Sequence, residues 1–107
     1  MPEIVIEKFL NGKSADVGQM TASGWVAWEV QLENSVRDDL LRDLLQKDLR
    51  SGFIRVVVCV QSRKDMQKVN AVVAEMAADP QFADLENINE KVSAQLLAAY
   101  LERSKEV

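Results

Sequence analysis

Two stretches in the first third of the chain have the hydrophobic pattern of β-strands. The β-branched residues that follow Pro2 predict a strand over about residues 3–10. Apolar and polar side chains alternate over residues 25–32, which predicts a second strand with one buried and one half-exposed face. The face predicted to be buried carries Val26, Trp28, Val30 and Leu32, and the other face carries Trp25, Ala27, Glu29 and Gln31.

Between these strands, residues 11–24 are mostly polar and contain three of the four glycines of the chain. Such a composition supplies no stripe of side chains for a core, so it predicts a long polar loop or a hairpin arm.

The middle of the chain predicts two helices around a further strand. Leucines over residues 36–49 recur at helical spacing, and Gly52 is placed to end that helix. Residues 53–61 are apolar on both faces, which is typical of a strand with neighbours on both sides. A capping box at Ser62 then predicts a helix that Asp79-Pro80 ends.

Residues 87–104 predict a last helix that is apolar around nearly its whole circumference. A surface helix of a monomer needs only one apolar stripe, so we expect this helix to contact a second chain, either another copy in a homodimer or a different protein. The alternative is that it fills a groove of its own domain. The predicted interface, which includes the half-exposed face of the second strand, comprises Trp25, Ala27, Leu97, Tyr100 and Leu101.

These elements predict one domain over residues 1–107 with an α+β fold, or a mixed α/β one. The expected order is β-β-α-β-α-α, with a single small sheet of three to four strands packed by two or three helices. The first two strands are expected to pair antiparallel. The second and third are joined by a helix and should run parallel if they are neighbours.

Composition narrows the class of protein. The chain has 107 residues, 48% of them hydrophobic, and a formal net charge of -4, which excludes a disordered tail or a disulfide scaffold. The acidic balance argues against nucleic acid and membranes as partners. No targeting segment or membrane span is visible, so we expect a small acidic cytoplasmic protein.

Catalytic chemistry is limited by what the sequence lacks. There is no histidine, and the single cysteine, Cys59, lies in an apolar run where we expect an inert core thiol. Carboxylates, lysines, Tyr100 or a hard metal held by oxygen are the remaining options, and none shows a diagnostic spacing. We therefore expect no cofactor and no metal site, and the sequence favours a non-enzymatic role without deciding between this and an enzyme.

The clearest polar signal is a basic segment. Residues 50–68 carry five basic side chains and one acidic one. Ser62, Arg63 and Lys64 lie in it, where a strand passes into a helix, and helix N-termini favour anions. Two functions are thus open: a protein-interaction module that uses the C-terminal helix, or a domain that binds a small anionic ligand at these three residues. A lesser alternative is stacking of single-stranded nucleic acid on the aromatic and basic residues Trp25, Trp28, Phe53 and Arg55.

Overall fold

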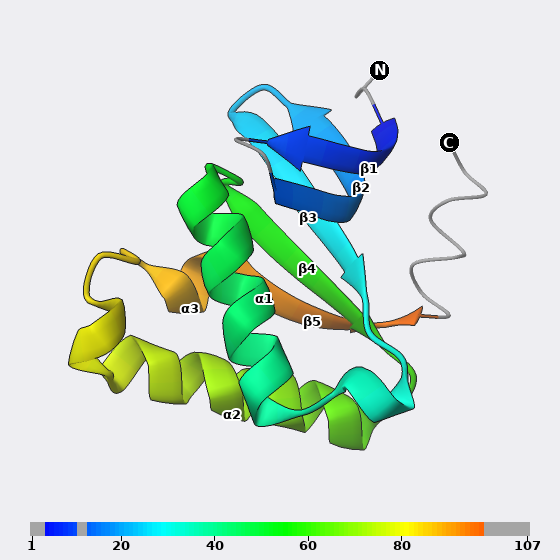
Figure 1. Cartoon of the computed structure of the whole chain (residues 1–107). Helices are drawn as coiled ribbons and strands as arrows, with labels where there is room; N and C mark the ends of the chain where they lie inside the picture. The colour runs from blue at the N-terminus through cyan, green and yellow to red at the C-terminus, as the bar shows by residue number, and fades with distance from the viewer. Residues whose placement is uncertain (1–3, 11–12, 98–107) are drawn as a thin grey trace.

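The computed structural model describes residues 4–10 and 13–97, which form one mixed β-sheet with helices packed on it (Figure 1). The strands are β1 (Ile4–Leu10), β2 (Lys13–Thr21), β3 (Gly24–Val30), β4 (Arg55–Val60) and β5 (Val92–Leu96). The helices are α1 (Asp38–Ser51), α2 (Arg63–Ala78) and α3 (Ile88–Lys91), and the short 3-10 turns are Glu33–Ser35 and Pro80–Phe82. None of these helices has the length and apolar character that crossing a membrane requires.

The strands lie side by side in the order β1-β2-β3-β4-β5. β2 runs antiparallel to β1 and β3, whereas β3, β4 and β5 are parallel and are joined by helical crossovers. The α+β fold with a mixed sheet and three helices is therefore confirmed, as is the parallel pairing of the strands predicted over residues 25–32 and 53–61. Over the described residues the sheet has five strands, whereas three to four were predicted. The predicted antiparallel pairing of the first two strands is wrong, because β2 lies between them.

Residues 11–24 were predicted as a long polar loop or a hairpin arm, and the loop is wrong, because residues 13–21 form β2, which pairs with both of its neighbours as a hairpin arm does. Its polar side chains are compatible with a strand since both of its edges are paired, to β1 and to β3. A tight turn then leads into β3 at Gly24, whose φ of +138° favours glycine and whose added Cβ would lie 3.0 Å from the Ile54 side chain. This hairpin adds a strand that the hydrophobic pattern did not reveal.

The predicted helix over residues 87–104 is a third correction. Only Ile88–Lys91 is helical before the chain enters β5. The predicted order β-β-α-β-α-α therefore lacks the strand that follows α3. β5 pairs in parallel with β4, so the backbone groups on that edge of β4 gain ladder partners that a helix at this position would not supply. Residues 98–104 lie outside the described residues.

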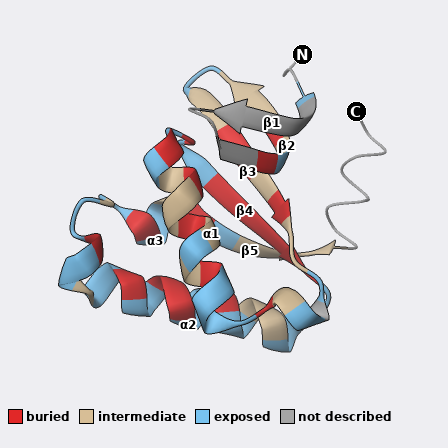
Figure 2. Ribbon diagram, in the orientation of Figure 1, coloured by how far each residue is buried: buried red, intermediate tan, exposed pale blue. Residues whose placement is uncertain are grey.

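The two faces of the sheet bury different sets of side chains, and β4 between them is buried along most of its length (Figure 2). We call the side that packs against α1 and α2 the helix face, and the opposite side the second face. The larger core lies on the helix face and includes Ala27, Val56 and Val58 with side chains from all three helices. A smaller cluster on the second face joins Val26, Val57 and Cys59 with the partly buried Trp28, Val30 and Leu97.

This arrangement changes the faces predicted for β3, although Val26 is buried as predicted. Ala27 and Glu29 were expected to be half exposed, but they are 0% and 2% exposed because α1 covers their side of the sheet. The buried state predicted for Cys59 is confirmed. Periodicity identified the strand correctly but could not show which face receives the helices.

Two predicted helix ends are confirmed and explain the connections. Gly52 follows α1 with a φ of 107°, and its N–H donates to the carbonyls of Asp48 and Leu49. Ser62 precedes α2, and its Oγ accepts a hydrogen bond of 3.1 Å from the N–H of Asp65. Both caps fix where β4 begins and ends between its flanking helices.

Candidate functional site

A recess of about 380 Å³ lies on the second face, across four neighbouring elements of the sheet. Its floor is apolar and aromatic and its rim carries hydroxyl, amide and guanidinium groups. Concave sites with this mixture are typical of small-molecule binding. The lining residues are Gln19, Thr21, Ser23, Val26, Trp28, Ile54, Arg55, Val57, Ser93 and Gln95.

Local structure fixes the wall formed by β2 and β3. The indole Nε1 of Trp28 donates a hydrogen bond of 3.0 Å to Oε1 of Gln19 on the neighbouring strand. At the end of the hairpin, the Thr21 hydroxyl donates to the Gly24 carbonyl over 2.8 Å and accepts from the Ser23 N–H at 3.3 Å. The Trp28 indole and the Thr21 hydroxyl of the recess are thus held by the same hairpin.

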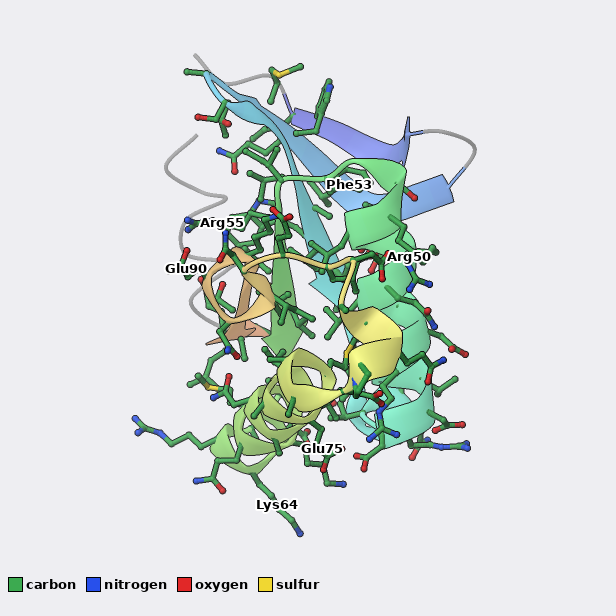
Figure 3. The ribbon with its side chains drawn as sticks, turned by 90° about the vertical axis from the view of Figure 1, so that its left-hand side faces the viewer. Arg50, Phe53, Arg55, Lys64, Glu75 and Glu90 are labelled. Carbon is green, nitrogen blue, oxygen red and sulfur yellow. The ribbon has the colours of Figure 1, made fainter. Side chains whose placement is uncertain are left out.

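Arg55 supplies the positive charge of the recess. It is the first residue of β4, its side chain is exposed, and it pairs across the ladder with Val26. In the part of the chain that the structure describes, Arg55 makes no ion pair, and no acidic residue lines the recess. Figure 3 shows Arg55 on the other side of the sheet from Arg50 of α1. Among its described lining residues the recess therefore carries one positive charge and no negative one, in a chain of net charge -4.

A second group of polar side chains lies on the helix face, under α1. Lys47 Nζ is 3.7 Å from Oε2 of Glu29 and 3.6 Å from Oδ1 of Asp48. Both acids are buried, at 2% and 0% exposure of their side chains, whereas Lys47 is 32% exposed. We call Glu29, Lys47 and Asp48 the carboxyl cluster. Burial of ionisable groups at this density is unusual in so small a core.

The carboxyl cluster lies where β2 and β3 stop forming ladder hydrogen bonds. The backbone register of this pair ends at Val17 and Trp28. Beyond these two residues, carboxylate oxygens of side chains accept the hydrogen bonds that backbone carbonyls accept in a ladder. The Asp16 N–H donates to Oε1 of Glu29 and the Val30 N–H donates to Oδ2 of Asp16, each over 2.8 Å. Glu29 thus bonds β2 while it contacts Lys47 on α1.

Burial raises the pKa of Asp48 to about 9, and the hydrogen bond and charge of Glu29 act in the same direction, while Lys47 opposes them. Asp48 is therefore protonated at neutral pH. Carboxyls and a lysine are the groups that the sequence left available for chemistry, and the structure brings them together. Within the described residues, however, no three acidic or cysteine side chains are arranged to hold a metal ion.

The predicted anion site keeps Ser62 and Lys64 together but not Arg63. A recess of about 410 Å³ at the start of α2 is lined by Gln61, Ser62, Lys64, Asp65 and Lys68. The Ser62 hydroxyl caps the helix there.

The residues of the predicted interface are dispersed. Trp25 packs against the main core, Ala27 is fully buried beneath the helices, and Leu97 packs on the second face. Tyr100 and Leu101 lie outside the described residues.

Sequence reasoning missed Glu29 and most of the recess. Of the four residues proposed to stack nucleic acid, Trp28 and Arg55 line the recess, whereas Trp25 and Phe53 pack with the main core. Glu29 is the only acid in a strand with strong alternation of apolar and polar residues, and this was the available signal. The alternation assigned Glu29 to the half-exposed face instead. The recess depends on β2 and β5, which were not predicted as strands. Comparisons of the chain with protein-family models, with curated proteins and with solved structures found no match.

Proposed function

We propose that this protein is a binding module whose second face holds a small ligand with a flat apolar part and one anionic group. The observation that carries the proposal is the lining of the recess, which joins an aromatic and aliphatic floor to Arg55 without any acidic residue. The ligand class is the anionic one that the sequence suggested, at a different place.

The parts of the recess match the two parts of such a ligand. The partly exposed Trp28 offers a surface on which a flat ring gains by leaving water, with the nearly buried Val26 and Val57 beside it in the floor. The planar guanidinium of Arg55 matches the bidentate geometry of a carboxylate or sulfonate. The hydroxyl groups of Thr21, Ser23 and Ser93 provide further polar contacts around the rim.

The test uses two probes of the same size and different charge, 2-naphthoate and the neutral 2-naphthalenemethanol. Amide chemical shifts of the ¹⁵N-labelled protein would be followed during each titration. We expect 2-naphthoate to move the amides of residues 19–28 and 54–57 and to bind at least tenfold more tightly than the alcohol, which corresponds to about 1.4 kcal/mol.

Two arginine variants make the test specific. Arg55→Gln should weaken 2-naphthoate binding at least tenfold and leave binding of the alcohol unchanged. Arg63→Gln removes the same charge from an exposed arginine outside the recess and should change neither. Equal binding of 2-naphthoate by wild type and Arg55→Gln would overturn the proposal. So would shifts that depend on protein concentration without ligand, because these would show that a second copy occupies the face.

A further inference from the structure

The carboxyl cluster has no part in the proposed binding site, since it lies on the opposite side of the sheet. It connects three elements: Glu29 belongs to β3 and accepts from the Asp16 N–H of β2, while Lys47 and Asp48 belong to α1. The contact is thus a polar attachment of α1 to the β2 and β3 pair, within a core that is otherwise apolar.

The charges of the cluster balance only when it holds one proton. Two ionised carboxyls and one ammonium leave a net negative charge in a site shielded from water, which is strongly unfavourable. No N–H group donates to the Asp48 carboxyl at hydrogen-bond distance among the described residues. A proton on Asp48 makes the cluster neutral and supplies a donor for Glu29.

We propose that Glu29, Lys47 and Asp48 form a proton-dependent clasp that fastens α1 to the β2 and β3 pair. The clasp is closed while Asp48 is protonated and is loosened when that proton leaves, because two buried carboxylates then share a single counter-ion. Loosening it weakens the attachment of α1 before the apolar contacts of the helix are disturbed.

Among the side chains that the structure describes, the surroundings of the clasp contain few other charges. Asp16 of β2 is exposed and accepts from the Val30 N–H, so it faces the cluster from the edge. β4 and α2 meet α1 with apolar side chains of the main core. Arg42 of α1 and Glu75 of α2 pair with each other at the surface. The proton on Asp48 therefore has Glu29 and Lys47 as its immediate charged neighbours.

The sign of the pH effect follows from the raised pKa of Asp48. Its ordinary value is 3.8 and its folded value is about 9, so the chain takes up a proton on folding between these limits. Stability from this group is fully present below pH 3.8 and is lost as pH rises towards 9. Asp48→Asn keeps a hydrogen-bond donor beside Glu29 but does not titrate, so it should remove this dependence.

The experiment measures urea unfolding of wild type and Asp48→Asn between pH 5 and pH 8. We expect the unfolding equilibrium constant of wild type to rise at least 100-fold relative to that of Asp48→Asn over this range. Asp38→Asn, which changes an exposed acid on the same helix, should follow wild type. Parallel pH profiles for wild type and Asp48→Asn would overturn the clasp.

A direct titration keeps the proposal falsifiable if Asp48→Asn fails to fold. Carboxyl ¹³C NMR of wild type should show Asp48 titrating near pH 9, and the amide of Asp16 should shift with the same midpoint because it donates to Glu29. A midpoint below pH 5 for Asp48, or an Asp16 amide that does not respond, would contradict the proposal.

Discussion

The two faces of the sheet bury apolar side chains from the same strands, yet they differ in what covers them. On the helix face, Val56 and Val58 pack beneath α1 and α2 in one large cluster. On the second face, Val57 and Cys59 join a smaller cluster to which α1, α2 and α3 contribute no residue. β4 is apolar on both sides, as the sequence predicted, but one side packs beneath the helices and the other belongs to the smaller cluster.

The polar groups on the two faces differ in the same way. The helix face encloses Glu29 and Asp48 almost completely, so their charges must be balanced within the protein. The second face keeps Arg55 at the rim of a recess, where its charge stays available to an anion. Polar groups on the helix face thus act within the fold, whereas we propose that those on the second face meet a ligand.

The largest expected change in the free energy of unfolding comes from removing core volume under α1. Leu45 is fully buried on the helix face, so Leu45→Ala should lower the free energy of unfolding by about 3 kcal/mol. Leu32→Ala, at a leucine that is 55% exposed, should lower it by less than about 0.5 kcal/mol. Urea unfolding followed by circular dichroism measures both, and similar losses for the two variants would show that α1 does not cover a core.

A smaller but sharper test uses adjacent residues of β4. Val58→Ala removes buried volume from the helix face and should cost about 2 kcal/mol, whereas Val57→Ala on the second face should cost about 1 kcal/mol. Binding should show the reverse order, because Val57 lines the recess and Val58 does not. Urea unfolding and 2-naphthoate titration of the two variants separate these effects. Equal binding losses would mean that the faces are not independent.

Much of the fold could be predicted because short-range signals decided it. Gly52, Ser62 and Asp79 act within a few residues of themselves, and their roles as helix ends follow from backbone and side-chain chemistry that the sequence displays. The parallel relation of β3 and β4 followed from the helix that joins them. Such features need no knowledge of distant parts of the chain.

The remaining features depend on contacts between distant segments. β2 is polar and contains a glycine, so only its pairing with two neighbours makes it a strand. β5 is short, and its residues were predicted to be part of an apolar helix, although they form a strand beside β4. The burial of Glu29 required Lys47 and Asp48 to arrive from α1, and the recess needed β2, β3, β4 and β5 together. Tertiary pairing outweighed local preference in each case.

The smallest expected effect lies at the end of β4, between the two faces. Ser62→Ala removes the cap of α2 and should lower the free energy of unfolding by about 1 kcal/mol, while Ser62→Gly should lower it by only a few tenths. Because Ser62 lines neither the recess on the second face nor the carboxyl cluster, both variants should retain 2-naphthoate binding and the pH profile of wild type.

Urea unfolding with and without inorganic phosphate completes the test of Ser62. Equal stabilisation of wild type and Ser62→Ala by phosphate assigns Ser62 to capping. A greater stabilisation of wild type would instead place an anion site at Ser62. Ligand binding would then not be limited to the second face, because the start of α2 would be another binding surface.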